Sequence, residues 1–438
     1  MTEGASRSAE LRRRAKAVFA GGSPFMYDLP DEVNVVLERG RGSRVWDADG
    51  REWIDYHLGS GPLLIGHSHP GVVEAVKDQV ERGSTFYYLN RPAIELAERV
   101  VEAVPCAEAV KLVSSGTEAT FYALRIARAW TGRSKLLKFE GALHGGNDYA
   151  TQSTVPPRRS PYPRSIPDSD GIPAATSAEV LIGEFNDLPG AERIVAGHGA
   201  ELAAIIVEPM QRALAPAPGF LAGLRALAAR SGALLVFDEI VTGFRLAWGG
   251  AQERYGVVPD LCTLGKAIGG GYPVAAVAGR RDVMAVTSQG RRGSGRYAWV
   301  SGTLNANPVG ATAGLATLDV LARPGSFPRL HELGERLRRG IEAAGRALGL
   351  PVQALGDGPL AQVFFAPAPP RSHADVMASD AALRRRFGEE LLRRGILVMP
   401  GEKLYLSLAH SDADLEATLA AAADALSAIA RDRVGVDG

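Results

Sequence analysis

The sequence has few cysteines, no net charge and no long apolar run. Only Cys106 and Cys262 occur among 438 residues, which excludes a disulfide framework and argues against a cysteine-based metal site. Lysine plus arginine and aspartate plus glutamate both number 49, so the charge balance indicates no nucleic-acid or anionic membrane partner. No apolar run has the length that crosses a bilayer, and the first ten residues lack the apolar core of a signal peptide. We therefore expect a cytoplasmic protein that binds neither nucleic acid nor membrane.

A metal site is also not expected. His67 and His69 lie two residues apart in a Gly/Pro turn, and no third ligand type lies near them in the sequence.

The middle of the chain alternates helical patterns with short apolar segments. Helices are predicted over 71–82 and 92–103, and a helical pattern also runs through Arg128. The apolar segments are hydrophobic on nearly every residue, as in strands buried on both faces by helices; they are 110–113, 136–139, 203–207, 233–237 and 261–264. This pattern predicts an α/β fold with a mostly parallel central sheet, flanked by helices, and a ligand site at the carboxyl ends of its strands.

The two ends of the chain have a different, mixed pattern. Near the N-terminus we predict a helix and three strands, at 7–19, 33–37, 44–46 and 53–56. Near the C-terminus we predict two helices and two strands, at 327–348, 362–365, 396–399 and 412–430. We expect residues 1–69 and 326–438 to form a small α+β domain, and residues 70–325 to form a large one.

The stretch 153–173 contains six prolines and several arginines, so it is not regular structure. It is too long for a simple connector. A lid over the site and a surface excursion without function both remain open.

Small hydroxyl residues follow the first predicted strand of the sheet. Ser115, Gly116 and Thr117 stand between that strand and a helical pattern, where free backbone N–H groups and the positive end of the helix dipole favour an anion such as phosphate. The same Ser-x-x-Glu spacing is also an ordinary helix cap, so this motif alone is weak evidence.

Two further strand ends carry ionisable residues. Asp238 directly follows the apolar run 233–237, and a carboxylate at this strand end is suited to hold a positively charged ring nitrogen. Lys266 follows the apolar run 261–264 and precedes three glycines, which predicts a partly desolvated amine with a lowered pKa. A phosphate cradle, an aspartate and a lysine at successive strand ends are the anchors that pyridoxal 5'-phosphate (PLP) needs.

These residues lie within longer motifs that resemble a known family. The sequence is similar to the class III PLP-dependent aminotransferases of fold type I and, within them, to the glutamate-1-semialdehyde aminomutases. The similar segments run in order along nearly the whole chain; they include Val45-Trp-Asp-Ala-Asp-Gly50, Gly61-Pro-Leu-Leu-Ile-Gly-His67, Ser115-Gly-Thr-Glu-Ala119, Val207-Glu-Pro209, Phe237-Asp-Glu-Ile-Val-Thr-Gly-Phe-Arg245, Gly249-Gly-Ala-Gln252, Leu264-Gly-Lys266 and Gly302-Thr-Leu304.

The resemblance implies a role for each matching residue. Lys266 would hold PLP as a Schiff base and carry the proton at the substrate carbon, while Asp238 would pair with the pyridine nitrogen. Ser115, Gly116 and Thr117 would bind the phosphate.

Other cofactor contacts are implied by the same resemblance. Ile240 would pack on one ring face, and Glu208 and Gln211 would lie near the ring hydroxyl. His144 matches the family's Tyr-His-Gly motif, although its tyrosine is Leu143 here. Thr303 would bind the phosphate of the other subunit, which implies a homodimer with shared active sites.

The reaction is less constrained than the cofactor. We expect an aminotransferase that moves an amino group from a small-molecule donor, such as glutamate, to a carbonyl acceptor through Lys266. The alternatives are an intramolecular aminomutase and a PLP racemase or epimerase, and a catalytically silent homologue is a fourth class.

The substrate side departs from the aminomutase pattern. That pattern has an arginine shortly after Ser-Pro, whereas Ser23-Pro24 is followed by Phe25-Met26-Tyr27, and its tryptophan before Gly-Pro is Ser60. Sequence does not decide which arginine binds a substrate carboxylate; the candidates are Arg245, Arg291, Arg292 and Arg296.

Overall fold

A computed structural model describes residues 6–25, 27 and 29–434 of the chain. Its centre is a seven-stranded sheet with the strand order β4-β10-β9-β8-β7-β5-β6. The strands are β4 (Ala109–Val113), β5 (Lys135–Phe139), β6 (Val180–Gly183), β7 (Leu202–Val207), β8 (Leu234–Glu239), β9 (Leu261–Leu264) and β10 (Ala275–Gly279). The five strands predicted for this region are confirmed, and β6 and β10 were not predicted.

The sheet is parallel except at β10, which runs antiparallel to both β4 and β9. Strands β4 and β9 therefore point the same way, and the carboxyl ends of β4, β5, β7, β8 and β9 meet at one edge. Parallel sheets bind ligands at this edge.

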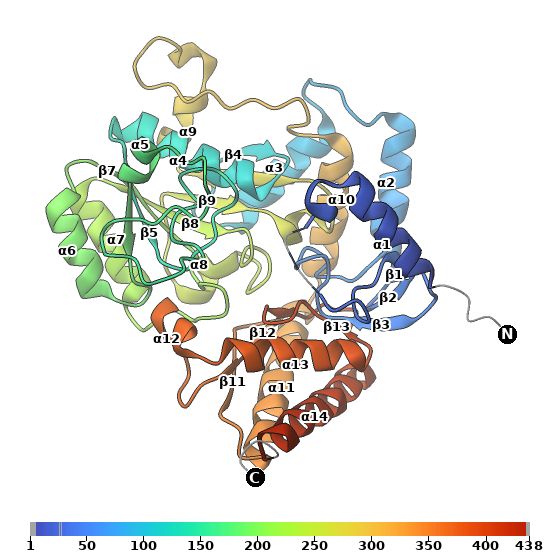
Figure 1. The fold of residues 1–438 in the computed structure, drawn as a ribbon. Coiled ribbons are helices and arrows are strands. Elements are labelled where there is room, and N and C mark those ends of the chain that lie inside the picture. Colours follow the sequence, from blue (N-terminus) through green and yellow to red (C-terminus); the bar gives the residue numbers. More distant parts are fainter. Residues whose placement is uncertain (1–5, 26, 28, 435–438) are drawn as a thin grey trace.

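Helices cover both faces of the sheet (Figure 1). Along β7, Ile205 and Val207 pack into one apolar core, while Ala204 and Ile206 pack into another. This alternation explains why the strands are apolar on nearly every residue. The helices of this part of the chain are α2 (Pro70–Arg82), α3 (Arg91–Ala103), α4 (Gly116–Thr131), α5 (Ala174–Ala178), α6 (Leu188–His198), α7 (Phe220–Ser231), α8 (Gly250–Tyr255), α9 (Arg281–Met284) and α10 (Pro308–Leu321), with 3-10 turns at Lys266–Gly269, Ala285–Thr287 and Gln289–Arg291.

The two ends of the chain come together beside this sheet (Figure 1). Strand β13 (Ile396–Leu397) pairs in parallel with β3 (Glu52–Asp55), which completes a four-stranded sheet with β1 (Leu37–Arg41) and β2 (Arg44–Asp47). A three-stranded sheet and three helices pack into the same core; they are β11 (Val352–Leu355), β12 (Leu360–Phe365), β14 (Leu404–Tyr405), α11 (Ser326–Ala347), α13 (Ala381–Arg393) and α14 (Asp412–Val434). The other helices of the chain ends are α1 (Arg7–Val18) and α12 (His373–Ala378), with a 3-10 turn at Ala20–Gly22.

One predicted strand is wrong. Residues 33–36 are not a strand, and β1 begins only at Leu37. The backbone N–H groups of Val33 and Asn34 both donate to the carbonyl of Pro30, so a turn replaces the strand. The apolar run is explained by burial of Val33, which is 1% exposed in the core of the chain ends.

The proline-rich stretch 153–173 is tied to the sheet rather than to the site. The hydroxyl of Tyr162 donates to Glu140 at 2.6 Å, and Arg164 forms a bridge with Leu181 of β6. No residue of 153–173 lines the cavity described below.

Two absences concern the described part of the chain. There, no helix has both the length and the apolar character needed to span a membrane. The same residues include no group of three or more histidine, cysteine, aspartate or glutamate side chains arranged to hold a metal ion.

Candidate active site

A cavity of about 490 Å³ lies at the carboxyl edge of the large sheet. Seven of the ten predicted site residues line it: Ser115, Gly116, Thr117, Glu208, Asp238, Ile240 and Lys266. Three of its lining residues are not glycine but have a positive φ, namely Ser60 (68°), Arg212 (58°) and Lys266 (46°). Such backbone strain costs about 1–3 kcal/mol per residue and is concentrated at functional sites.

Lys266 follows β9 and its side chain reaches toward the N-terminal part of the chain. The ammonium donates to the backbone carbonyl of Ser60 at 2.8 Å. Burial lowers the pKa of Lys266, and Lys403 and Arg245 lower it further because they carry like charge. An amine with a lowered pKa is a better nucleophile and base near neutral pH.

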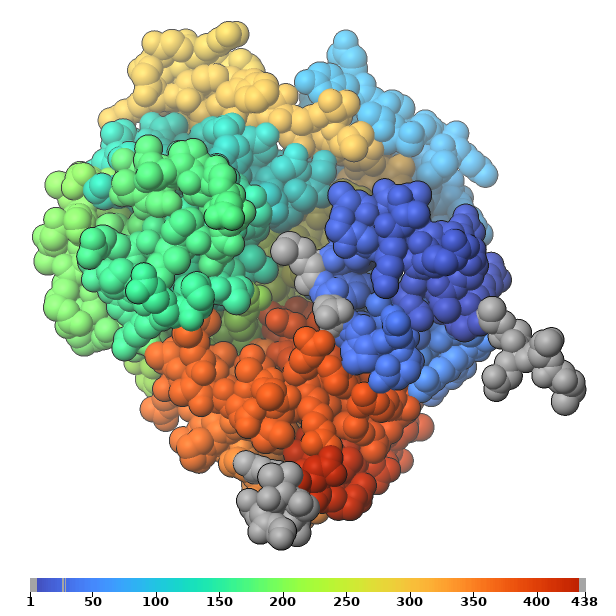
Figure 2. All heavy atoms as spheres, viewed as in Figure 1, coloured from blue at the N-terminus to red at the C-terminus, as the bar shows by residue number. Residues whose placement is uncertain are grey.

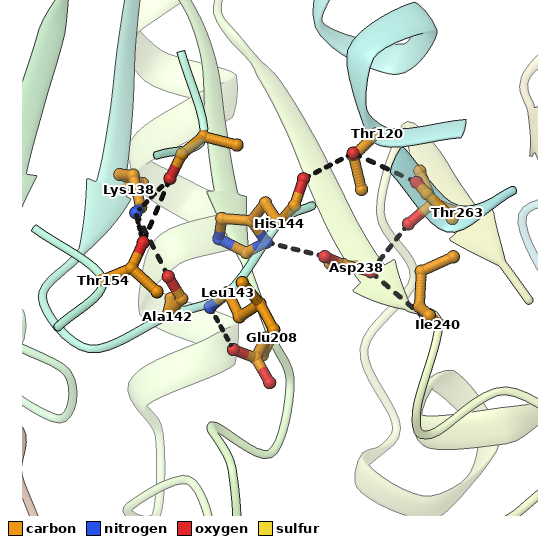
Figure 3. Close-up of polar contacts among 12 residues, drawn as sticks. Thr120, Lys138, Ala142, Leu143, His144, Thr154, Glu208, Asp238, Ile240 and Thr263 are labelled. Atoms are coloured by element: carbon orange, nitrogen blue, oxygen red, sulfur yellow. Dashed lines mark hydrogen bonds and ion pairs between the residues drawn. The ribbon is translucent and has the colours of Figure 1, made fainter. Parts of the chain in front are cut away.

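Asp238 is the last residue but one of β8 and is 4% exposed. One carboxylate oxygen lies 2.7 Å from Nδ1 of His144, and the other accepts from the hydroxyl of Thr263 at 2.9 Å and from the N–H of Ile240 at 3.1 Å (Figure 3). These partners fix the orientation of the carboxylate. Asp238 is thus a buried, oriented anion in the cavity wall.

Ser115 caps helix α4, as the ordinary-cap interpretation of the motif predicted. Its hydroxyl accepts from the N–H of Glu118 at 3.2 Å, and the Glu118 carboxylate accepts from the N–H of Ser114 at 2.9 Å. The cap does not conflict with an anion site, because the first-turn N–H groups of Gly116 and Thr117 have no partner within the helix.

Ile240 packs tightly between two glycines. A Cβ atom on Gly116 would lie 3.1 Å from Cδ1 of Ile240, and one on Gly265 would lie 3.0 Å from the same atom. The two glycines therefore leave space for the Ile240 side chain in the cavity wall.

Three predicted residues do not line the cavity. His144 lies behind Asp238, and Gln211 donates from its side chain to the carbonyl of Glu140 at 2.7 Å. Thr303 is exposed on the surface. Leu143 replaces the expected tyrosine and does line the cavity, where it is 48% exposed and its N–H donates to Glu208 at 2.7 Å.

The four candidate arginines lie elsewhere. Arg245 is fully buried and donates to the carbonyls of Val241 and Gly61, while Arg291, Arg292 and Arg296 are exposed. Phe25 and Tyr27 stack on each other, with ring centroids 5.9 Å apart, outside the cavity. Met26 lies outside the described residues.

The cavity has a second wall that sequence reasoning missed. It comes from the C-terminal part of the chain and consists of Met399, Glu402, Lys403 and Tyr405, with His57 and Ser60 beside it. Arg212 is a further cation that was missed. No sequence motif marks Met399, Glu402, Lys403, Tyr405 or Arg212 as a site residue.

Known proteins resemble this chain over almost its full length. The model of the family described as "Aminotransferase class-III" matches residues 27–420. The chain belongs to the class III aminotransferases. A glutamate-1-semialdehyde 2,1-aminomutase from Desulforudis audaxviator is 43% identical, and the match covers 97% of this chain and 98% of the aminomutase.

Solved structures of the same class agree. An omega-transaminase from Sphaerobacter thermophilus has a TM-score of 0.90 at 37% identity, with 97% of this chain and 98% of that chain covered. A transaminase with PLP bound has a TM-score of 0.88 at 31% identity, with the same coverage. The mostly parallel sheet flanked by helices is that of fold type I, and the cofactor of this class III enzyme is PLP.

The residues of the cavity fit this cofactor chemically. Lys266 offers an amine for its aldehyde, Asp238 an oriented carboxylate for its ring nitrogen, and the N-terminus of α4 a site for its phosphate. The Asp238 carboxylate is buried and the Lys266 side chain is partly buried, and ionisable groups withdrawn from water in a cavity are typical of functional sites.

Proposed function

We propose that this class III enzyme moves an amino group on a small molecule, with Lys266 as the residue that holds PLP and transfers the proton. The observation that carries the proposal is one cavity that contains the partly buried Lys266 amine, the buried Asp238 carboxylate and the N-terminus of α4. When bound, PLP withdraws electrons from the substrate bonds next to nitrogen.

Each residue then has a distinct task. The pKa of Lys266 is lowered, first by burial, which makes its amine a better proton acceptor than an exposed lysine at the same pH. Asp238 holds a proton on the ring nitrogen, and His144 and Thr263 keep its carboxylate in place. Ser115, Gly116 and Thr117 bind the phosphate, and Ile240 limits the space on one face of the ring.

Two routes for the amino group are proposed. The name of the curated relative supports an intramolecular shift, as in an aminomutase, better than the transfer between two molecules that we expected from the sequence. Transfer between molecules is the second candidate, because Phe25, Tyr27 and Ser60 stand where the aminomutase pattern has its arginine and tryptophan, and an omega-transaminase is 37% identical.

One pair of assays separates the routes. In the first, the holoenzyme is given L-glutamate without an acceptor; bleaching of the cofactor absorption with matching release of 2-oxoglutarate identifies a transaminase. In the second, it is given glutamate-1-semialdehyde alone; conversion into 5-amino-4-oxopentanoate without release of a keto acid identifies an aminomutase. Inversion of an amino acid without either product would point to a racemase.

The assignment of Lys266 has its own test. Borohydride reduction should attach the cofactor covalently to the wild-type protein and not to Lys266→Ala. A reducible covalent attachment in Lys266→Ala would show that another residue holds the cofactor.

We also propose a homodimer with shared sites. Four large apolar side chains are more than half exposed on two neighbouring segments: Tyr88 (85%), Leu89 (92%), Trp299 (57%) and Leu304 (54%). Tyr87 and Ser301 join these segments through their hydroxyls at 3.5 Å. The light-blue and gold stretches of the chain adjoin at the top of the molecule in Figure 2. Thr303 lies within this surface, where a partner could use it.

Subunit mixing tests the shared site. Lys266→Ala and Thr303→Val homodimers should both be impaired, and hybrids of the two should regain activity because one of their two sites is intact. Absence of any recovery in verified hybrids would contradict a contribution of Thr303 across subunits. The cytoplasmic location stays a prediction.

A further inference from the structure

Lys403 is a buried lysine in the cavity wall without an anionic partner. Its exposed fraction is 6%, and among the described residues no carboxylate lies within ion-pair distance of its ammonium. A buried ammonium without an opposite charge is costly, so such residues usually serve a ligand.

Tyr405 lies on the same face of the chain as Lys403. The two are two residues apart at strand β14, and alternate residues of a strand share a face. Lys403 and Tyr405 both line the cavity. Their neighbours Leu404 and Leu406 point the other way and pack into the core of the chain ends. The wall thus presents an ammonium and a phenol hydroxyl side by side.

The surroundings of Tyr405 are strongly cationic. Burial and the nearby Glu402 carboxylate raise the pKa of its hydroxyl, but Lys403, Lys266 and Arg245 together overcome both effects and lower it. The guanidinium of Arg245 lies 5.3 Å from the centre of the Tyr405 ring. Three positive charges around one hydroxyl leave this corner of the cavity electropositive.

The carboxylates of the cavity do not neutralise this corner. Asp238 is bound by His144 and Thr263, and Glu208 accepts from the N–H groups of Leu143 and Arg212. Glu402 is exposed, although it adjoins Lys403 in sequence. Glu402 therefore offsets only part of the positive charge of Lys403, Lys266 and Arg245 at Tyr405, and an anion bound in the cavity would balance the rest.

We infer that Lys403 and Tyr405 bind the carboxylate of the substrate. The inference rests on the proposed function and names its substrate class, a carboxylate-bearing amine or carbonyl compound. The N-terminal loop of this chain has Phe25 and Tyr27 where the aminomutase pattern has an arginine. We infer that Lys403, from the C-terminal wall of the cavity, supplies the positive charge for the carboxylate instead.

The test uses an unreactive acid and its neutral amide. Binding of 3-phenylpropanoate and 3-phenylpropanamide to the PLP-loaded protein is measured by calorimetry for the wild type, Lys403→Met, Lys403→Arg and Tyr405→Phe. We expect the wild type to prefer the acid by about tenfold, Lys403→Met to lose that preference, and Lys403→Arg to keep it. Tyr405→Phe keeps the ring and removes the hydroxyl, so it should weaken binding of the acid by about threefold and leave binding of the amide unchanged.

Three outcomes would overturn the inference. They are an undiminished preference for the acid in Lys403→Met, no preference in the wild type, and a loss of PLP affinity in Lys403→Met, which would pair Lys403 with the cofactor phosphate instead. PLP affinity is measured separately by absorption titration. Failure of the wild type to bind PLP or to move an amino group would instead reject the proposed function.

Discussion

The Nδ1 atom of His144 lies 2.7 Å from Oδ2 of Asp238, and the two side chains are 1% and 4% exposed. His144 belongs to the loop after β5, and its carbonyl accepts from the hydroxyl of Thr120 in α4 at 2.5 Å. One histidine therefore links the aspartate of β8 to the helix whose N-terminus lies in the cavity (Figure 3).

Removing this histidine should destabilise the protein and loosen Asp238. We expect His144→Ala to lower the free energy of unfolding by about 2 kcal/mol, because a buried carboxylate loses a hydrogen-bond partner. His144→Asn is the matched control, since its side-chain amide occupies nearly the position of Nδ1. Urea unfolding of both variants checks this, and equal losses would show that the contact to Asp238 is not the cause.

Lys138 should hold the loop that carries His144. Its buried ammonium donates to the carbonyls of Ala142, Ala150 and Gln152 at 3.1, 2.9 and 2.5 Å, and to the hydroxyl of Thr154 at 3.2 Å. We expect Lys138→Met to lower the free energy of unfolding by about 3 kcal/mol, because buried carbonyls lose their donor. Amide exchange over residues 142–154 should become faster.

The control for Lys138 lies on the same strand. Lys135 makes only two long contacts, at 3.5 Å to the carbonyl of Ala178 and 3.5 Å to Glu201. Lys135→Met should change the unfolding free energy and loop exchange little. Similar exchange rates in Lys138→Met and Lys135→Met would refute the role of Lys138 in the loop.

Gly61 should be intolerant of a side chain because of Tyr405. Its φ is +100°, and a Cβ atom there would lie 2.6 Å from Cε1 of the Tyr405 ring. Gly50 has a φ of +84° with nothing within 4 Å of an added Cβ, so Gly50→Ala measures the backbone cost alone, about 1 kcal/mol. Gly61→Ala should cost a further 1–3 kcal/mol, roughly, from the clash. Equal thermal shifts in the two variants would mean that the ring moves away freely.

His410 should make the fold sensitive to acid. Burial lowers the pKa of His410 to about 4 from its ordinary 6.5. Between these pH values the unfolded chain takes up a proton that the folded chain does not, so stability falls as the pH drops from 6.5 toward 4. The full effect is about 3 kcal/mol.

His410→Asn isolates this contribution. Its side-chain oxygen can accept from the N–H of Ser407, as Nδ1 of His410 does at 3.1 Å, but it does not titrate. Urea midpoints measured at pH 7 and pH 4.5 should fall less in the variant than in the wild type. If the urea midpoint fell equally in the variant and the wild type between pH 7 and pH 4.5, groups other than His410 would cause the acid sensitivity.

The strand ends of the site could be predicted because their sequence signals are local. Asp238 comes directly after the apolar run 233–237 and Lys266 comes shortly after the mostly apolar β9, and the motif around Ser115 carries its own helix cap. The local sequence therefore indicates where each of these strands ends and which residues at its end belong to the site.

The missed features depend on contacts that are distant in sequence. Strand β10 reads Ala-Ala-Val-Ala-Gly, with little β-propensity, and pairing with β4 and β9 on either side defines it. Strand β14 has only two residues, and its pairing with β12 brings Lys403 and Tyr405 to the cavity. No local pattern identifies a lysine whose environment is built by such pairing.

The parallel pairing of β3 with β13 has a consequence for biosynthesis. Ile54 pairs with Ile396, so the N-terminal sheet can be completed only after residue 396 has been synthesised and has left the ribosome. Until then β3 has an unpaired edge, which is a template for association with other nascent chains. Synthesis of β13, rather than of the first three strands, is the event that allows this sheet to be completed.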